Sequence, residues 1–433
     1  MNCKLKIFVV TIILILMISS CGGRPQPPAS QAGITQVAER SGDGAIDANS
    51  SVANLPKCNV NVYIENSASM DGYVKGVTEF EQAIYSYISD IKLADFCDAL
   101  NLNYINSKIL KQPDDVSDFI EKLEPSSFRI KGGNRGTTDI SNLFHSIMEE
   151  QGKDDVAILI SDFVFSPGKR DASEFLTNQQ IGIKTHFVTR LKEDPDYAAV
   201  LYRLTSKFDG KYYNRVDSPT QISAVRPFFV WLLGNKDQLQ RLTSEIKKEN
   251  IKGKGVQNTF CISKMFQATP YSILPMPRVG TFQIDPANVK NSILKAKIDK
   301  KNPNEKFMVS FGVNYNSFLL EDSYLTDPEN YEINNKAYSV EIIRNPNSAT
   351  SQYTHIIKLK LDASQPVISR GNIKVSLLKK SAPWADSLTD YDGMDINADG
   401  AMEKTFGLKT LIDGVYDAYK TDNNYASFTI NIQ

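Results

Sequence analysis

Five consecutive apolar residues at positions 156–160, Val-Ala-Ile-Leu-Ile, constrain the fold of this chain most strongly. A strand with one face in water alternates apolar and polar side chains, whereas this run presents no polar face at all. Strands with this pattern lie inside parallel sheets whose two faces are both covered by helices. The run therefore predicts an α/β domain built around a buried parallel sheet.

Segments on both sides of this run alternate between strand-like and helix-like apolar spacing. The strand-like segments are residues 60–64, 102–110, 183–188 and 228–233, and the helix-like segments are residues 77–91, 116–123, 140–148 and 238–248. Strands that alternate with helices are joined by crossover connections, which place the strands in parallel within one sheet. These segments predict one α/β domain over residues 58–252.

The sequence changes in character after about residue 256. Short β-like runs follow at residues 307–313, 338–343, 354–361, 373–378 and 427–432, and turn residues separate them. One stretch with helical spacing, residues 408–419, interrupts the series. The pattern predicts a β-sandwich of immunoglobulin-like type over residues 253–433, with a short helical insertion. We expect the boundary between the two domains, and proteolytic cleavage, in the Gly- and Pro-rich stretch 252–277.

The N-terminus has the features of a secretory signal over residues 1–20. Two lysines precede an apolar run at residues 7–18, which is shorter than the roughly 20 residues that span a bilayer. Residues 18–21, Ile-Ser-Ser-Cys, then resemble a lipobox, in which the cysteine thiol receives diacylglycerol. The alternative is an ordinary signal peptide that contains a cysteine by chance. We expect cleavage before Cys21 and lipidation of its thiol.

Residues 21–57 are rich in Gly, Pro, Ser and Ala and show no apolar periodicity. Such a composition is typical of a flexible tether. We therefore expect Cys21 to anchor the protein to a membrane of the cell envelope, with the folded part held away from the bilayer. No acidic residue directly follows Cys21, which favours the periplasmic face of the outer membrane over its outer surface.

Cys58, Cys97 and Cys261 would remain in the mature chain and face an oxidising compartment. Cys58 stands just before the first predicted strand. The next predicted helix runs back to the same end of the sheet, and Cys97 follows it. We therefore expect a disulfide between Cys58 and Cys97.

Charge and motif content argue against several classes of function. Lys and Arg number 49 against 50 Asp and Glu, so no basic surface for nucleic acid is indicated. The three histidines lack zinc-ligand spacing, and the sequence contains no nucleophile elbow, Walker loop or dinucleotide fingerprint. We expect a binding protein rather than an enzyme, and no nucleic-acid partner.

Oxygen-bearing side chains follow three of the predicted elements. Glu65, Ser67 and Ser69 come after the first strand, Thr138 lies in a Gly-rich loop before a helix, and Asp162 follows the buried run. In an open α/β sheet, ligands bind at the carboxyl ends of the strands. Hydroxyls and carboxylates gathered there suit a hard cation such as Mg²⁺, which takes oxygen ligands in octahedral geometry.

These three elements, in this order, resemble the von Willebrand factor type A-like family across roughly residues 59–250. The family's Asp-x-Ser-x-Ser signature corresponds to Glu65-x-Ser67-x-Ser69, its loop threonine to Thr138 and its strand-end aspartate to Asp162. The resemblance implies a doubly wound, mostly parallel sheet and a metal-ion-dependent adhesion site. It implies that Ser67, Ser69 and Thr138 bind Mg²⁺ or Mn²⁺ through their hydroxyls, while Glu65 and Asp162 act mostly through water. One coordination position would stay open for an acidic group of a partner protein.

The chain departs from the family pattern at two positions. Glu65 stands where the family has Asp and carries its carboxylate forward by ~1.5 Å. Phe163 follows Asp162, where Gly is common. Thr137 also competes with Thr138, which is favoured because it lies nearer the start of the helix. Either the cation site is retained, or the chain has the fold without the metal and the two serines only cap the loop and helix.

A second candidate cation site is the stretch 395–400, Asp-Ile-Asn-Ala-Asp-Gly, which matches the opening of an EF-hand loop. The twelfth position of such a loop is Phe406 rather than a bidentate acid, so only half of the motif is present. We interpret Asp395, Asn397 and Asp399 as a solvated turn, at which we expect at most weak Ca²⁺ binding.

Three functions compete on these observations. The leading one is a membrane-anchored lipoprotein that binds an acidic group of a protein partner through the strand-end cation. The second is a metal-free structural subunit of an envelope assembly, and the third is a hydrolase that uses the cation as a Lewis acid. Cation binding separates the first and third from the second. Turnover of an ester or phosphoester separates the third from the first.

Overall fold

The computed structural model of the protein describes residues 55–112, 115–136, 138–264 and 269–433. The predicted signal, Cys21 and most of the predicted tether lie outside the described residues. Across the described ranges, no helix combines the length and the apolar character needed to cross a bilayer.

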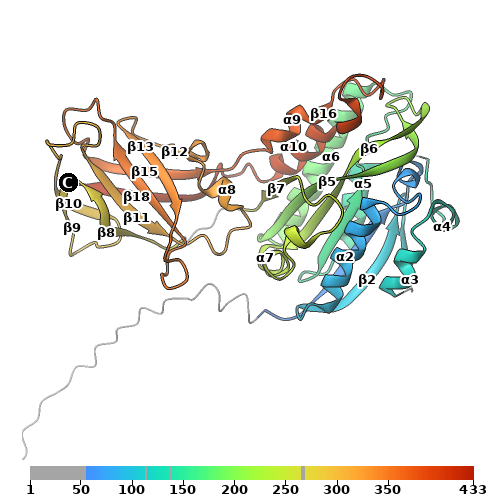
Figure 1. Ribbon diagram of the computed structural model, residues 1–433, viewed down its shortest axis with the longest axis horizontal. Coiled ribbons are helices and arrows are strands. Elements are labelled where there is room, and N and C mark those ends of the chain that lie inside the picture. Colours follow the sequence, from blue (N-terminus) through green and yellow to red (C-terminus); the bar gives the residue numbers. More distant parts are fainter. Residues whose placement is uncertain (1–54, 113–114, 137, 265–268) are drawn as a thin grey trace, which may run out of the picture. The chain divides into compact units, whose positions relative to one another are not determined.

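The first half of the chain is built on a seven-stranded sheet with the order β3-β2-β1-β4-β6-β5-β7 (Figure 1). Its strands are β1 (Cys58–Glu65), β2 (Cys97–Ile105), β3 (Ile109–Gln112), β4 (Val156–Ser161), β5 (Tyr197–Tyr213), β6 (Pro219–Asn235) and β7 (Asn258–Ile262). β1 lies between β2 and β4 and pairs with both in parallel. β4 occupies the centre and is buried along its whole length, so the prediction of a strand covered on both faces is confirmed.

The sheet is mixed, so the prediction of a mostly parallel sheet was wrong. Only β2, β1 and β4 pair in parallel, whereas β6 runs antiparallel to both β4 and β5, and β3 and β7 form antiparallel edges. β5 runs in the direction of β4, as a crossover through helix α6 (Ala172–Glu193) requires. The short turn at residues 214–218 then returns the chain as β6, which inserts between β4 and β5. Such a short connection can join only antiparallel strands.

Helices cover both faces of this sheet. They are α2 (Glu79–Leu93), α3 (Val116–Glu121), α4 (Pro125–Ile130), α5 (Ile140–Glu150), α6 and α7 (Lys236–Glu245). Tyr63 and Leu159 face a core that they share with α5 and α6, whereas Val62 and Ile158 face a second core shared with α2, α3 and α7. Successive residues of a strand point to opposite faces, which explains this division. The predicted α/β class is confirmed.

One predicted strand, residues 183–188, lies inside helix α6. Ile183 and Phe187 stand four residues apart on this helix and are both buried. That spacing places them on one face of a helix. A short apolar run fits both the two-residue period of a strand and the 3.6-residue period of a helix. The polar residues around this run gave no apolar periodicity that would indicate the longer helix.

The second half of the chain contains two further sheets. Their strands are β8 (Tyr271–Val279), β9 (Thr281–Ile284), β10 (Ser292–Lys297), β11 (Met308–Val313), β12 (Tyr331–Ile333), β13 (Tyr338–Arg344), β14 (His355–Leu361), β15 (Gly371–Leu378) and β18 (Asn424–Ile432). One sheet has the order β13-β14-β11-β8 and the other β12-β15-β18-β10-β9. The rings of Phe311 on β11 and Phe428 on β18 lie 5.8 Å apart, so the two sheets share a core. All five predicted β-runs fall on these strands.

The structure differs from the predicted division at residues 252/253. β7 follows that division, yet it pairs with β5 and completes the first sheet. The helical insertion comprises α9 (Pro383–Ser387), β16 (Thr389–Asp390), η4 (Ala401–Glu403), β17 (Thr405–Phe406) and α10 (Leu408–Ala418). Its helix α10 packs on α6, where Gly414 lies against Ile183, and the hydroxyl of Tyr419 donates to the carbonyl of Tyr197 at 3.2 Å. The described residues cluster as one compact unit.

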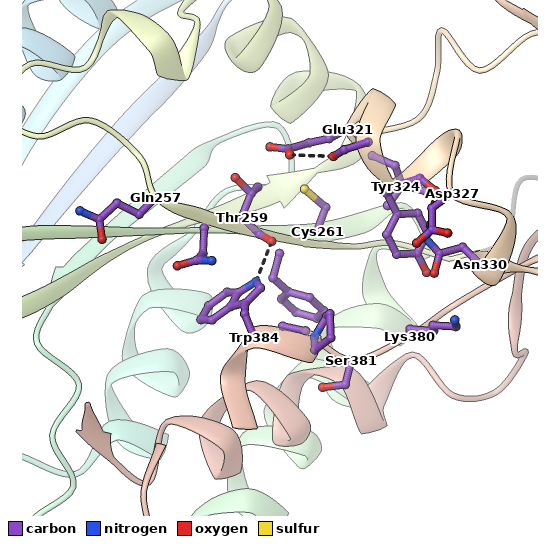
Figure 2. A pocket seen from close by; sticks show the side chains of 16 residues that line it. Gln257, Thr259, Cys261, Glu321, Tyr324, Asp327, Asn330, Lys380, Ser381 and Trp384 are labelled. Carbon is purple, nitrogen blue, oxygen red and sulfur yellow. Dashed lines mark hydrogen bonds between the residues drawn. The ribbon is translucent and has the colours of Figure 1, made fainter. Parts of the chain in front are cut away.

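Side chains from the C-terminal part close the outer edge of β7. The indole Nε1 of Trp384 donates to the carbonyl of Thr259 at 3.1 Å, and the hydroxyl of Tyr425 donates to the carbonyl of Cys261 at 2.9 Å. A cavity of ≈ 350 Å³ remains beside these contacts, lined by β7, α8 (Asp322–Leu325), η3 (Pro328–Asn330) and α9 (Figure 2). Because an open strand edge can recruit further strands, these contacts protect the sheet.

Cys58 and Cys97 lie opposite one another in the register of β1 and β2, so their predicted proximity is confirmed. The predicted disulfide between them is not formed, because both thiols are free, as is that of Cys261. Burial, reinforced by the neighbouring Cys97, raises the pKa of Cys58 to about 12. The Cys58 thiol therefore stays protonated at neutral pH, which makes it a poor nucleophile for disulfide exchange.

Candidate metal centre

The five predicted ligands meet at the carboxyl ends of β1 and β4. Glu65 ends β1, Ser67 and Ser69 lie at the start of η1 (Ala68–Gly72), Thr138 precedes α5, and Asp162 follows β4. A cavity of ≈ 90 Å³ lies among them and is lined by Glu65, both serines and Thr138. The Asp162 carboxylate is close enough to Glu65 to raise the pKa of that carboxyl. The structure therefore brings all five side chains together.

The two serine hydroxyls face each other at the start of η1. Ser67 Oγ and Ser69 Oγ lie 3.0 Å apart. Ser67 occupies the N-cap position of η1, yet its side chain makes no capping hydrogen bond. The interpretation that these serines only cap the turn is therefore not supported at Ser67, and the two hydroxyls point at each other and at the site carboxylates instead.

Thr138 carries a buried hydroxyl that has no hydrogen-bond partner among the described residues. The residue is 7% exposed, and its Oγ1 is completely covered. Asp139 caps α5 instead, because its carboxylate accepts from the N–H of Asn142 at 3.1 Å. A buried polar atom without a partner costs about 1–3 kcal/mol, and a ligand in the adjoining cavity would relieve that cost. Thr137, the competing threonine, lies outside the described residues.

Glu65 is 3% exposed and reaches across to β4, where the hydroxyl of Ser161 donates to its carboxylate. Burial is the main cause that raises the pKa of Glu65, to about 7, and the Asp162 carboxylate adds to the rise. The nearby hydroxyls of Ser161, Thr138 and Ser67 oppose it, because they stabilise the charged form. The extra methylene of Glu65, relative to the family's Asp, gives the carboxylate this reach.

Asp162 is buried beside Glu65, directly after β4. Burial raises the pKa of Asp162, whereas the positive charge of Arg226 lowers it. One oxygen of Asp162 accepts from the N–H of Val164 at 3.3 Å. The Ser69 hydroxyl also stabilises the charged form of Asp162 and lowers its pKa, so the carboxylate is held by its own loop and by the loop after β1.

Phe163, the second departure from the family pattern, has a positive φ of 48°. This left-handed conformation favours glycine, which explains why glycine is common at the position. Here the ring of Phe163 packs in the core, 6.3 Å from that of Phe144 and 6.2 Å from that of Phe229. The packing of the aromatic ring offsets the backbone strain, so the turn after Asp162 keeps its shape without glycine.

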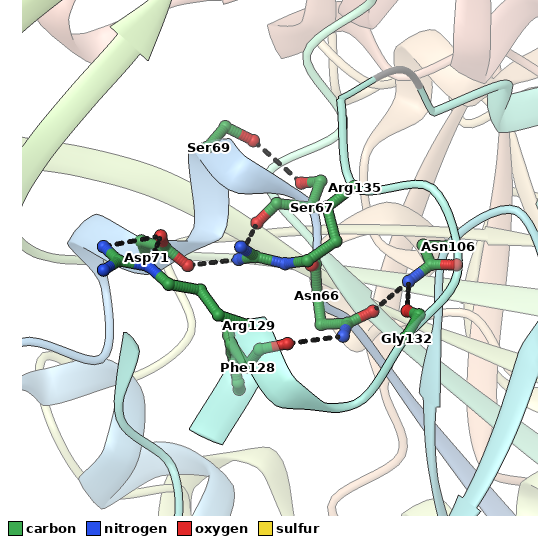
Figure 3. Close-up of polar contacts among 9 residues, drawn as sticks. All are labelled: Asn66, Ser67, Ser69, Asp71, Asn106, Phe128, Arg129, Gly132 and Arg135. Carbon is green, nitrogen blue, oxygen red and sulfur yellow. Dashed lines mark hydrogen bonds and ion pairs between the residues drawn. The ribbon is translucent and has the colours of Figure 1, made fainter. Parts of the chain in front are cut away.

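Arg135 ties the Gly-rich loop before α5 to the loop after β1 (Figure 3). Its Nε donates to the carbonyl of Asn66 at 2.7 Å, and its Nη2 donates to that of Ser67 at 3.2 Å. The carbonyl of Arg135 accepts from the N–H of Ala68 at 3.0 Å. Asp71 pairs with the same guanidinium. These contacts fix the distance between the loop that carries the serines and the loop that carries the threonine.

A second link joins the same Gly-rich loop to the end of β2. The Nδ2 of Asn106 donates to Asn66 Oδ1 at 2.7 Å and to the carbonyl of Gly132 at 3.0 Å (Figure 3). Gly133 has a φ of 78°, and a Cβ on it would lie 2.0 Å from Asn106 Oδ1. Only glycine fits there, which accounts for the composition of the loop.

The β5–β6 hairpin forms one wall of the cavity. The register of β4 with β6 leaves residues 219–228 of β6 beyond the end of β4. The part of β5 that pairs with this overhang packs closely on η1, since a Cβ on Gly210 of β5 would lie 2.7 Å from the Cα of Gly72. At the end of the hairpin, Tyr213 and Asp217 line the cavity.

The Asp-rich stretch 395–400 forms an exposed turn. Asp395, Asn397 and Asp399 are all exposed, and Asp395 Oδ1 accepts from the N–H of Asn397 at 2.9 Å. These positions agree with the interpretation as a solvated turn. In the part of the chain that the structure describes, no three His, Cys, Asp or Glu side chains converge as a metal cluster. The centre at Glu65 is of another kind, because most of its oxygen donors are hydroxyls.

Sequence reasoning missed three residues of this site. Arg135 lies inside the Gly-rich loop and Ser161 directly precedes Asp162, so their adjacency to the motif was an available signal. Arg226 lies on β6, in a stretch without any motif. Only the pairing of β6 with β4 brings it to the site.

The donor set fits a hard divalent cation. Its three hydroxyls and two carboxylates are the oxygen ligands that Mg²⁺ and Mn²⁺ prefer. The hydroxyl of Thr138 suits a ligand position, because it is buried beside the cavity and makes no hydrogen bond of ordinary length to the described residues. No family model, curated protein or solved structure matches this chain, so its function has to be inferred from the geometry of the site.

Proposed function

We propose that this protein is a lipid-anchored protein of the cell envelope whose α/β half is a von Willebrand factor type A-like module. The module binds an acidic group of a partner protein through Mg²⁺ or Mn²⁺ at the strand ends. The order of the signature residues in the sequence supports this proposal. The three parallel strands β2, β1 and β4, with helices on both faces, are consistent with it.

The unpartnered hydroxyl of Thr138 carries the proposal. It is buried at a cavity that the serine hydroxyls and Glu65 also line. A site that had lost its cation would be expected to satisfy or replace this atom, because a buried unsatisfied hydroxyl is costly. A cation bound at this cavity would explain why the Thr138 hydroxyl is retained.

The residues divide the work of binding between them. Ser67, Ser69 and Thr138 supply neutral hydroxyl oxygens, and Glu65 and Asp162 supply negative charge, directly or through water. A bound cation would supply a Lewis-acidic centre with an open position for a carboxylate. The cavity of ≈ 90 Å³ has room for one small group.

Thermal unfolding and calorimetry with Mg²⁺ and Mn²⁺ test this proposal. A cation at ten times its Kd should raise the melting temperature by ~2 °C for a cooperative unit of this size, and a chelator should reverse the effect. Asp162→Ala should abolish the shift. Asp395→Ala, in the exposed turn, is the matched control and should leave the shift unchanged. Identical wild-type melting with and without cation, together with no heat of binding, would contradict the proposal.

A second candidate function is a metal-free structural subunit, which one observation favours. Arg226 lies near Asp162, and the pKa of Glu65 is raised to about 7. With Glu65 protonated and Asp162 balanced by Arg226, the cavity is close to neutral without any metal. A metal-free subunit would keep its partner in the presence of chelator, whereas the cation-dependent module would release it.

A further inference from the structure

We propose that Arg226 is a specificity-determining residue of the strand-end site: a resident positive charge that weakens cation binding but makes the loaded site attract an anion. This inference rests on the proposed cation-binding function and adds the electrostatic rule by which the site chooses its ligands.

The register of the sheet places Arg226 beside the site. Ser161, the last residue of β4, pairs with Phe229 of β6, which brings the next residue, Asp162, level with Phe228. Arg226 lies two residues further along β6. Residues two apart share a face of a strand, so Arg226 and Phe228 are on the same face. Arg226 is 1% exposed, so water does not screen its charge from the site.

The guanidinium of Arg226 is held by neutral groups. It donates to the carbonyls of Ala401 at 3.3 Å and Met402 at 3.2 Å, and it lies 4.7 Å from the centre of the Tyr212 ring. Among the described residues, no carboxylate forms an ion pair with it. Its positive charge is therefore not neutralised by a direct partner, and it acts on the buried carboxylate of Asp162, which lies level with Phe228 on the same strand as Arg226.

The formal charges show what this does to ligand choice. Glu65 and Asp162, both ionised, together with Arg226 leave one net negative charge, which attracts a divalent cation. Once the cation is bound, one net positive charge remains. Two carboxylates and a divalent cation without Arg226 would be neutral. The Arg226 charge therefore opposes the cation and favours an anionic group in the open position.

Arg226→Gln tests this assignment, because glutamine removes the charge and can still donate to the carbonyl of Ala401. In calorimetry, Arg226→Gln should bind Mn²⁺ at least ~10-fold more tightly than the wild type, since a buried repulsive charge is gone. Arg226→Lys keeps the charge and should stay within ~3-fold of the wild type.

Arg203→Gln is the matched control. Arg203 lies on β5 and donates to the carbonyl of Glu403, so it holds the same segment. It sits one strand further from β4, because β6 separates β5 from β4. Mn²⁺ affinity should change little in this variant. If Arg203→Gln raised Mn²⁺ affinity as much as Arg226→Gln does, the position of residues 401–403, rather than the charge of Arg226, would control cation affinity.

The second arm uses acetate as the anionic probe and needs no variant that might fail to fold. At constant ionic strength, acetate should raise the melting temperature of the Mn²⁺-loaded wild type but not of the chelated protein. Acetamide, which is neutral and of similar size, should have no effect on either. In Arg226→Gln the effect of acetate should disappear. Loss of the Arg226 charge should therefore have opposite effects on the two ligands, with tighter binding of the cation and weaker binding of the anion.

The outcomes separate this inference from the proposed function. If the wild type binds Mn²⁺ and Arg226→Gln binds it with the same affinity, the role of Arg226 is overturned but the proposed function stands. The same conclusion follows if acetate has no effect on the Mn²⁺-loaded wild type. If Arg226→Gln binds Mn²⁺ and the wild type does not, Arg226 takes the place of the cation in the natural protein. That result would support the role of the Arg226 charge and overturn the proposed function. No Mn²⁺ binding in either protein would overturn both.

Discussion

The hydroxyl of Ser161 on β4 donates to the buried carboxylate of Glu65 on β1, and the same hydroxyl accepts from the N–H of Phe163 at 2.8 Å. This contact depends on the length of Glu65, because an aspartate at that position is shorter by one methylene. From the sequence alone, restoring the family's Asp would be expected to preserve or tighten cation binding. The contact adds a cost that the sequence does not show, because the shorter side chain would lose its hydrogen bond with Ser161.

We expect Glu65→Asp to lower the free energy of unfolding by about 1–2 kcal/mol in the absence of metal, because it leaves the buried Ser161 hydroxyl without an acceptor. Chemical denaturation with chelator measures this loss. In the double variant with Ser161→Ala, the additional loss caused by Glu65→Asp should be smaller. Additive losses in the two single variants would mean that the contact is not energetically significant.

The stability of the chelated protein should fall as pH rises from 5 to 8. The pKa of Glu65 is about 7 in the fold, above the ordinary glutamate value of 4.5, so the folded state holds a proton that the unfolded chain releases more readily. That contribution is fully present below about pH 4.5 and is lost as pH rises through 7, by about 3 kcal/mol in total. Glu65→Gln, which mimics the protonated form, should remove this part of the pH dependence. An unchanged pH profile in Glu65→Gln would show that other groups cause it.

Thr138→Val should remove the cation-dependent increase in melting temperature while costing the chelated protein nothing. Valine has the shape of threonine without the unpartnered hydroxyl, so unfolding in chelator should cost the same or about 1 kcal/mol more. Thr405→Val is the control, because Thr405 on β17 also buries a hydroxyl that has no hydrogen-bond partner among the described residues. That variant should keep the full response to Mn²⁺. A clear loss of stability in chelated Thr138→Val would indicate a structural role instead.

Cys21→Ser should leave the protein without lipid. In the proposed lipid anchor the Cys21 sulfur receives diacylglycerol, and a serine hydroxyl would not replace it. Metabolic labelling with a fatty acid should mark the wild type and not the variant, and the variant should fractionate as uncleaved precursor or as soluble protein. Label on Cys21→Ser would contradict the lipid anchor.

The fold was predictable where one pattern excluded the alternatives. The apolar run 156–160 has no polar face, so it could only be a buried strand, and the structure places it as β4. The run 183–188 was too short to separate the two periods, and its helix is recognisable only over its full length. The insertion of β6 between β4 and β5 depends on which strands pair, and no local property of either strand encodes it.

The site was predictable as far as its residues follow the chain order of strands and loops. Glu65 and Asp162 come at strand ends, and parallel neighbours bring such ends together. The charge balance was not predictable, because Arg226 reaches the site only through the pairing of β6. The reason for Glu65 in place of Asp is also absent from the sequence, because it depends on the hydrogen bond from Ser161 across the sheet.

The bonds from Arg226 to the carbonyls near residue 401 connect positions 175 residues apart. During synthesis, β6 is therefore complete long before the backbone groups that hold its guanidinium exist. Until residues 401 and 402 emerge, the Arg226 guanidinium lacks its two carbonyl acceptors and has the Tyr212 ring beside it. If the chain is secreted as its N-terminus predicts, Arg226 gains these partners only after the chain has been delivered beyond residue 402.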